Sequence, residues 1–521
     1  MKKEPQHSDV SLYLNYLKET NLSGYLSDRT MNDLNFEDFF EYLDQTTSKV
    51  GQQYFYAKLC ANNLSDYSKE HEKITEKFST DADFVLQTEK QLKKLEKRDA
   101  YNIISLFTKE LPGISTFYSF VINILRFVPF TFAILLFAFH LNFCFYLLLL
   151  SIIVNFVIYY LNKSVQIPFQ YAIPQLLVLM KCSATLAVNS NFDSLSKDIL
   201  KDVDTLKPIS KTSTLFKVEN LLTTDISEVT LLITELLKIF TLTEPYLFHK
   251  TIKLIIGKQK EIEKLYCFAG EIDSLLAISK IRNAAPWYCL PSNNTSNVKF
   301  SFSDIVHPLV PSCVANSLSI QDKSILLTGS NMSGKSTFIR TIGVNILLAQ
   351  TINTCFARHF HLKQAVILDS MITISDDLMN SKSLFFEEVL TMKQMLECSE
   401  NGHHIYLLDE IFKGTNTLER IGAAKAVLSH LIMNGNIVFV STHDIELAEL
   451  LDSEYELYHF CEHIQKDEVK FDYLLKPGKL TSFNAIKILK MSGYADEIIE
   501  EANNTILKLM DKKVETLSSV K

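Results

Sequence analysis

The sequence predicts a multidomain protein with a mainly α-helical first part, an α/β domain after it and a short helical tail. Three observations support this prediction. The chain has 521 residues, which is too many for one hydrophobic core. Apolar residues recur at spacings of three and four through most of the first 285 residues, as in helices. Short β-type runs then alternate with helical segments until about residue 475, which is typical of an α/β sheet domain.

Composition and charge exclude several classes of protein. Apolar residues make up 47% and charged residues 21%, which excludes a disordered or collagen-like chain. The 52 Lys and Arg against 60 Asp and Glu give a net charge of -8, so only a local basic groove remains open for nucleic acid. The nine cysteines include no CxxC pair, which favours a reducing compartment over a disulfide scaffold. No apolar run follows the first ten residues, so we expect no cleaved signal peptide.

One long segment is more apolar than a soluble helix. Residues 127–162 contain no Asp, Glu, Lys or Arg. A single helix of that length would span about 54 Å, against roughly 30 Å of bilayer hydrocarbon. We therefore expect a hairpin that turns near His140, with transmembrane helices at about 127–143 and 144–162. Lysines on both sides predict a multi-pass protein of the cell membrane with both ends in the cytoplasm. A pair of fully buried core helices is the alternative.

These patterns divide the chain into five predicted parts. A first helical part precedes the membrane hairpin, a second helical part follows it, and the α/β domain and the tail complete the chain. The predicted ranges are 1–110, 111–165, 166–290, 291–475 and 476–521.

The clearest local motif is a GxxxxGK[ST] segment at residues 329–336. It follows the apolar run 325–327 and precedes a helical pattern, which is the order strand, loop, helix of a phosphate-binding loop. The backbone N–H groups of such a loop and of the first helical turn bind phosphate oxygens. Lys335 is expected at the β- and γ-phosphates as a catalytic residue, and Ser336 at Mg²⁺. The nucleotide-binding candidates here are Gly329, Asn331, Gly334, Lys335, Ser336 and Thr337.

Two further apolar runs end in polar residues. Residues 405–408 lead to Asp409 and Glu410, which we expect to hold Mg²⁺ and to polarise the attacking water, respectively. Residues 437–440 lead to His443, which we expect at the γ-phosphate; a solvated loop histidine is the alternative. These features predict a P-loop ATPase domain that uses ATP and Mg²⁺. No LSGGQ-like segment precedes Asp409, which disfavours a transporter-type ABC subunit.

Taken together, these segments resemble the MutS family of DNA mismatch-repair ATPases. TGSNMSGKSTFIRTIG (328–343) and LLDEIFKGTN (407–416) are similar to the family's two nucleotide-binding blocks. His307-Pro308-Leu309 and then Asn316 are similar to the lead-in of its ATPase domain. Helical blocks at 43–59 and 265–281 and the segment after the sheet also resemble the family.

The resemblance implies an ABC-class ATPase that works as a homodimer with composite ATP sites. In such a site Ser383 reaches the neighbouring subunit's nucleotide, Glu388 lies on the same helix, and Asn316 belongs to the nucleotide-binding set. The segment 376–396 carries the serine and its helix.

The chain also departs from the family's pattern. The first matching block begins by about residue 43, so we expect no mismatch-recognition domains before it. Ser330 stands where a Pro is common, and Phe412 stands where a Gly is usual. An apolar hairpin takes the place of a DNA clamp.

Two functions follow as expectations. The first, implied by the resemblance, is ATP-driven dimer closure coupled to DNA binding. The second is a membrane-tethered ATP-dependent switch or assembly factor that acts on protein partners. The residues themselves give little support for DNA, because the lysine-bearing segments 87–98 and 250–264 interleave Glu and are typical of solvated helix faces. Neither segment has aromatic residues spaced for base stacking.

Overall fold

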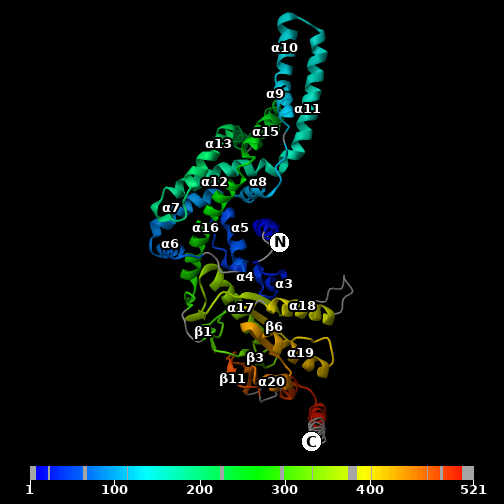
Figure 1. Cartoon of the computed structure of the whole chain (residues 1–521). Helices are drawn as coiled ribbons and strands as arrows, with labels where there is room; N and C mark the ends of the chain where they lie inside the picture. Colours follow the sequence, from blue (N-terminus) through cyan, green and yellow to red (C-terminus); the bar gives the residue numbers. More distant parts are fainter. Residues whose placement is uncertain are drawn as a thin grey trace. The chain divides into compact units, whose positions relative to one another are not determined.

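The computed structural model describes two compact units (Figure 1). The described residues are 7–20, 24–62, 67–113, 115–222, 228–293, 298–330, 332–372, 384–400, 402–465, 468–480 and 485–506. The helical unit comprises Met1–Ser23, Leu43–Leu59 and Tyr67–Ala284. The α/β unit comprises Gly24–Tyr42, Cys60–Asp66 and Ala285–Lys521. The helical first half and the α/β second half therefore agree with the sequence prediction.

Every regular element among the described residues of the helical unit is a helix. They are α1 (His7–Val10), α2 (Leu12–Thr20), α5 (Lys49–Leu59), α6 (Lys69–Thr80), α7 (Ala82–Leu92), η1 (Lys93–Leu95), η2 (Arg98–Ile104), α8 (Ser105–Thr108), α9 (Thr116–Leu125), α10 (Val128–Phe139), α11 (Phe143–Gln170), α12 (Ala172–Ala187), η3 (Ser190–Phe192), α13 (Ile199–Leu222), α14 (Glu228–Thr241), α15 (Thr243–Ile255) and α16 (Gln259–Ala284).

The centre of this unit is the contact between α5 and α16. Asp273 of α16 accepts hydrogen bonds from the N–H groups of Thr47 and Ser48, at 2.9 and 2.7 Å, and from the Ser48 hydroxyl at 2.6 Å. Its carboxylate thus satisfies N–H groups at the start of α5, which have no partner inside the helix. Gly51 allows this approach, since a Cβ there would lie 2.0 Å from Asp273 Oδ2.

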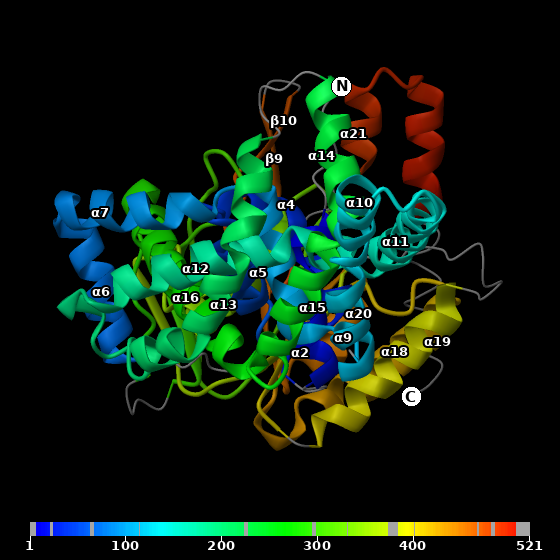
Figure 2. The ribbon, with the colours of Figure 1, turned by 90° about the horizontal axis from the view of Figure 1, so that it is seen from above.

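The helices α10 and α11 form a hairpin that extends beyond the other helices of the unit (Figure 1). The turn lies at 140–142, where His140 has a left-handed backbone with φ of 51°. Seen from above, the two helices lie side by side (Figure 2). Two apolar stretches, Phe117–Phe139 and Phe143–Ile167, are long enough and apolar enough to cross a membrane. The first begins ten residues before the predicted segment and includes α9, while the second continues five residues past it.

Polar side chains at Asn155 and Asn162 join α11 to its neighbours. Asn155 Nδ2 donates to the Phe240 carbonyl of α14 at 3.0 Å. Asn162 lies between two partners, the Tyr118 hydroxyl at 2.8 Å and His249 Nε2 at 2.7 Å. These contacts tie the base of the hairpin to α9, α14 and α15 and leave its tip without such bonds among the described residues.

The described residues of the α/β unit form three sheets. Its strands are β1 (Phe300–Ile305), β2 (Asn316–Ile320), β3 (Ser324–Thr328), β4 (His359–Leu362), β5 (Ile367–Met371), β6 (His404–Asp409), β7 (Ile437–Thr442), β8 (Tyr455–His459), β9 (Glu462–Gln465), β10 (Glu468–Phe471) and β11 (Lys476–Pro477). Its helices are α3 (Asp28–Asp33), α4 (Phe36–Leu43), α17 (Lys335–Ile352), α18 (Leu384–Ser399), α19 (Thr417–Leu431), η4 (Met433–Gly435), α20 (Ile445–Leu451) and α21 (Ala485–Met491).

The largest sheet has the order β11-β8-β3-β7-β6-β5. The five strands from β8 to β5 run parallel, and β11 is antiparallel at the edge. The strands β3, β6 and β7 are buried along nearly their whole length, which explains their unbroken apolar runs. Because the carboxyl ends of parallel strands share one edge, the residues after β3, β6 and β7 meet there. The other sheets are β2-β1-β4 and the hairpin β9–β10.

Residues 24–42 belong to the α/β unit, although the sequence analysis places them in the first helical part. Asp33 of α3 accepts hydrogen bonds from Ser370 Oγ at 2.6 Å and from the Ile372 N–H at 3.0 Å, at the end of β5. Leu34 packs against Gly343 of α17, where a Cβ would lie 2.7 Å from it. Helical periodicity shows that a segment is a helix, but it does not show which core the helix joins.

Candidate functional site

The loop between β3 and α17 depends on two glycines with left-handed backbones. Gly329 has φ of 148° and Gly334 has φ of 101°. A Cβ at Gly329 would lie 2.7 Å from the Phe460 carbonyl oxygen, so no larger residue fits without a shift. The helix α17 begins directly after Gly334, and its first N–H groups have no intrahelical partner. The predicted residue Asn331 lies outside the described residues.

Lys335 lies inside this loop. Its side chain is 3% exposed, and Nζ donates to the carbonyls of Gly329 at 2.8 Å and Ser330 at 2.9 Å. Burial lowers the pKa of this amine, while Glu410 and Asp409 oppose the shift. The amine is therefore held at the position from which it could bind a phosphate group on the loop.

Asp409 lies between two hydroxyl groups at the carboxyl edge of the sheet. Ser336 Oγ donates to Asp409 Oδ2 at 2.5 Å, and Ser441 Oγ donates to Oδ1. Ser336 comes from the first turn of α17 and Ser441 from the end of β7, so three elements converge on one carboxylate. Paired carboxylate and hydroxyl oxygens beside a phosphate-binding loop are ligands that suit Mg²⁺.

Glu410 has both carboxylate oxygens occupied. Oε1 lies 2.5 Å from His443 Nε2, and Oε2 lies 2.8 Å from Lys413 Nζ. The hydrogen bond from His443 is the largest cause that lowers the pKa of Glu410, to about 2, and Lys413 adds to it against the opposing effect of burial. The Glu410 N–H donates to the Ser441 carbonyl at 2.9 Å, which fixes the start of the following loop. The structure thus brings Glu410 and His443 into direct contact.

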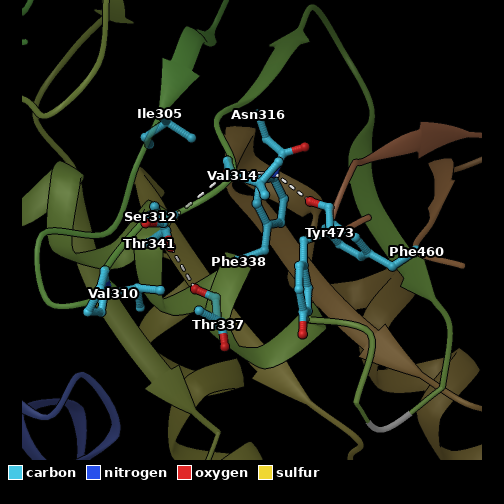
Figure 3. A pocket seen from close by; sticks show the side chains of 13 residues that line it. Ile305, Val310, Ser312, Val314, Asn316, Thr337, Phe338, Thr341, Phe460 and Tyr473 are labelled. Atoms are coloured by element: carbon cyan, nitrogen blue, oxygen red, sulfur yellow. Dashed lines mark hydrogen bonds between the residues drawn. The ribbon is translucent and has the colours of Figure 1, made fainter. Parts of the chain in front are cut away.

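A cavity of about 390 Å³ adjoins the start of α17. Figure 3 shows Asn316 at its wall, with its amide joined to the Tyr473 carbonyl, and the Tyr473 ring near Phe338. Asn316 also accepts a hydrogen bond from the Leu475 N–H at 2.7 Å, so it holds the loop that carries Tyr473. The lining residues are Ile305, Val310, Pro311, Ser312, Cys313, Val314, Asn316, Gly334, Thr337, Phe338, Thr341, Phe460 and Tyr473.

The size and lining of this cavity suit a flat, mostly apolar ring system attached to a phosphate chain on the loop. Thr337 lines the cavity, whereas Ser336 donates a hydrogen bond to Asp409. Asn316 lies at the wall of the cavity. The predicted residues therefore divide into a group at the loop and a group at this cavity.

Comparison with known proteins identifies this domain. Residues 325–510 match the model of the family described as MutS domain V. The chain is 30% identical over 268 residues to the DNA mismatch repair protein MutS of Fusobacterium nucleatum, and 29% identical over 218 residues to that of Thermus aquaticus. It is 30% identical over 210 residues to the mitochondrial DNA mismatch repair protein mutS homolog of Sarcophyton glaucum. Residues 325–510 are therefore similar to domain V of the MutS family.

The matches cover only part of each protein. They span 48%, 41% and 39% of this chain, and 29%, 27% and 21% of the respective relatives. The matches therefore cover less than a third of the length of these MutS proteins. Residues 325–510, which match the family model, include the loop and both carboxylates described above.

Both departures from the MutS pattern have structural consequences. Ser330 Oγ donates to Glu462 Oε2 at 3.0 Å, and Glu462 is 7% exposed at the start of β9. Phe412 adopts a left-handed backbone with φ of 61°, the region in which glycine has the least strain. Its buried ring lies 6.2 Å from the ring of Phe385 on α18, so packing offsets part of this strain.

The helix α18 lies against the loop that follows Glu410. A Cβ at Gly414 would lie 2.7 Å from Phe385 Cβ, so the loop and the helix approach closely. Glu388 of α18 is buried, and burial raises the pKa of its carboxyl group. Ser383, the predicted residue for the partner subunit's nucleotide, lies outside the described residues.

Four residues of the candidate site were missed by the sequence analysis. Ser441 precedes His443 at the end of an apolar strand, and its position was a usable signal. Lys413 follows Glu410 by three residues, a spacing that indicates contact only once the loop conformation is known. Tyr473 and Glu462 reach the site from residues after β8, and the sequence gives no signal for them.

Proposed function

We propose that the chain is a membrane-anchored ATPase of the MutS type that couples ATP-driven closure of a homodimer to DNA binding. The observation that supports the ATPase is the meeting of five side chains at one sheet edge. These are Lys335, Ser336, Asp409, Glu410 and His443.

Binding of the nucleotide uses the loop, the cavity and the first turn of α17. The triphosphate would accept hydrogen bonds from the N–H groups after Gly329 and from Lys335, which would exchange its carbonyl partners for phosphate oxygens. The base would lie in the cavity next to Tyr473. Ser336 and Asp409 would hold Mg²⁺, which offsets the negative charge of the phosphates.

Hydrolysis depends on Glu410. A carboxylate with a pKa of about 2 is ionised at neutral pH but is a weak base, so its role in this geometry is to orient a water molecule. His443 would keep the carboxylate in place and donate a hydrogen bond to the γ-phosphate side. Release of Glu410 from Lys413 would make it more basic.

Closure of a homodimer would change the geometry of this site through a movement of α18. By resemblance, Ser383 would contact the nucleotide of the partner subunit, and α18 packs on the loop that contains Lys413. A movement of the helix would therefore change the position of that loop and of Glu410.

The membrane anchor would be the hairpin of α10 and α11. Only 11% and 22% of the most apolar windows of the two candidate spans are buried within the protein. Large apolar side chains project from the surface, among them Phe137 (77%), Phe139 (66%) and Ile153 (59%). Exposure of this extent is costly in water and favourable in lipid hydrocarbon. The two helices would cross the membrane as a hairpin, so that both ends of the chain and the ATPase domain lie in the cytosol.

A protein-directed switch is the second candidate function. Several lysines of the helical unit pair with acidic residues, for example Lys280 with Glu89 at 2.7 Å and Lys264 with Asp202 at 3.5 Å. Pairing reduces the charge that would otherwise attract phosphates of DNA.

The first experiment measures ATP binding and turnover in native membranes. Lys335→Ala is expected to abolish binding of a fluorescent ATP analogue, because the loop loses its positive charge. Lys393→Ala, an exposed lysine on α18, is the matched control and should bind normally. Equal affinity of wild type and Lys335→Ala would contradict the nucleotide site.

Two further measurements separate the two functions. DNA that stimulates turnover, with an affinity that falls as salt rises, supports the DNA-directed function. Turnover that is indifferent to linear and branched DNA supports the switch. Recovery of the chain in the soluble fraction after membranes are sedimented would contradict the anchor.

A further inference from the structure

Two of the nine cysteines meet across a backbone bridge in the α/β unit. Cys289 lies between α16 and β1 along the chain, and Cys355 lies in the turn after α17. The N–H of each residue donates to the carbonyl of the other, both at 3.0 Å, in an antiparallel bridge. The sequence separates the two cysteines widely, so no CxxC motif marks them.

The geometry of this bridge suits a disulfide. Residues that exchange both hydrogen bonds in an antiparallel pair have Cα atoms about 5.5 Å apart and side chains on the same face. Disulfides require a Cα separation of about 4.4–6.8 Å. A side-chain hydrogen bond with Cys355 lowers the pKa of the Cys289 thiol, against the opposing effect of burial. The two side chains therefore lie next to each other on one face of the bridge.

Access to the two thiols differs. Cys289 is half-buried and lines a cavity of about 580 Å³ together with Ser301, His359 and His361. Cys355 is 0% exposed, and its Sγ lies 3.9 Å from the Asn345 carbonyl oxygen. A reagent in the cavity reaches Cys289 first, and Cys355 is placed to react second.

We propose that Cys289 and Cys355 form a redox-modifiable dithiol that a low-molecular-weight disulfide, such as oxidised glutathione, converts to a disulfide. The Cys289 thiolate attacks one sulfur of the reagent and releases one glutathione thiolate, which gives a mixed disulfide. Cys355 then transfers its proton to that thiolate, attacks Cys289 Sγ and releases the second glutathione. Two protein thiols are oxidised and one glutathione disulfide is reduced to two thiols.

The disulfide would connect the chain segment before β1 to the turn after α17. Because α17 begins with Lys335, the bond would restrain the far end of the helix that starts at the loop. This modification is independent of whether the chain hydrolyses ATP.

Differential alkylation of the full-length chain tests the proposal. The protein in membranes is equilibrated with graded ratios of reduced and oxidised glutathione, alkylated and analysed by mass spectrometry. We expect Cys289 and Cys355 to lose reactivity together and to appear as one cross-linked peptide, which a dithiol reductant reverses. Cys398, an exposed thiol whose pKa is raised by burial and by Asp369, should not cross-link. If Cys289 and Cys355 stay reduced under conditions that glutathionylate Cys398, the proposal is overturned.

Two variants test the order of attack. Cys355→Ser should stop at a glutathione adduct on Cys289, whereas Cys289→Ser should leave Cys355 reduced. Cys313→Ser, a thiol that lines the other cavity, is the control and should still give the cross-link. Oxidation of Cys355 in the Cys289→Ser variant would contradict the assignment of Cys289 as the first nucleophile.

Discussion

The two units each enclose a carboxylate, and the two groups behave in opposite ways. Asp273 of the helical unit is completely buried among the N–H groups and hydroxyl at the start of α5, and burial raises its pKa to about 6. Glu410 of the α/β unit has His443 on one oxygen and Lys413 on the other, and its pKa is lowered to about 2. The hydrogen bonds from Thr47 and Ser48 and the charge of Lys280 do not offset the cost of burying the charge of Asp273. For Glu410, His443 and Lys413 more than offset that cost.

This difference distinguishes a structural carboxylate from the one proposed to act in hydrolysis. Asp273 connects two helices and takes up a proton near pH 6, so its effect is on stability. Glu410 stays ionised at an edge where Asp409 and Lys335 also lie, so its charge is available for chemistry. Substitutions at or beside each carboxylate test whether each group has only the role that its surroundings indicate.

The largest expected effect follows from replacing Glu410 with Gln. The amide keeps the size of the side chain but removes its charge, so ATP turnover should fall by about 10²- to 10⁴-fold. Binding of ATP should persist, since Lys335 and Ser336 are unchanged. Single-turnover hydrolysis and equilibrium binding measure the two effects separately. Glu419→Gln, on the exposed first turn of α19, is the control, and wild-type turnover by Glu410→Gln would remove Glu410 from the mechanism.

On the helical side, Gly51→Ala should cause the largest loss of stability. The new Cβ would lie 2.0 Å from Asp273 Oδ2, so the carboxylate must leave its position at the start of α5. Overpacking and loss of the cap together should lower the free energy of unfolding by about 3 kcal/mol. Urea denaturation of the detergent-solubilised chain measures the loss.

Gly422→Ala provides the matched control for this substitution. Gly422 lies in α19 with nothing within 4 Å of an added Cβ, so alanine should stabilise the helix by about 0.5–1 kcal/mol. Equal effects of the two substitutions would show that Asp273 does not occupy the space above Gly51.

The same two regions show which features of the structure can be predicted from the sequence. The loop at Lys335 and the strands before Asp409 and His443 were predicted because buried parallel strands and a glycine-rich loop impose unbroken apolar runs and fixed spacings. Lys413 was not predicted, because its contact with Glu410 depends on the left-handed backbones of Glu410 and Phe412. Asp273 was not predicted either, since its partners at the start of α5 are more than 200 residues away in the chain.

The third prediction concerns pH. The folded-state pKa of Asp273, about 6, exceeds the ordinary value of 3.8, so the folded chain binds the proton more tightly than the unfolded chain. Stability from this group is therefore present at low pH and is lost as pH rises from about 4 to about 6. The difference corresponds to about 3 kcal/mol at most. Denaturation of wild type and Asp273→Asn between pH 4 and 7 isolates this contribution, and a constant difference between them would contradict it.

The smallest expected effect is that of Lys413→Met. Loss of the ammonium group from Glu410 Oε2 removes one of the two contacts that lower the pKa of Glu410, while His443 remains. The pKa should rise by about one unit, so the loss of turnover on acidification should begin at a higher pH than in wild type. Because both pKa values lie below pH 4, a pH profile of turnover between pH 2 and 6 measures this shift. Lys425→Met removes a lysine paired with Glu454 in the same unit and should leave the profile unchanged. An unaltered profile in Lys413→Met would mean that His443 alone sets the charge of Glu410, and that release from Lys413 is no part of turnover.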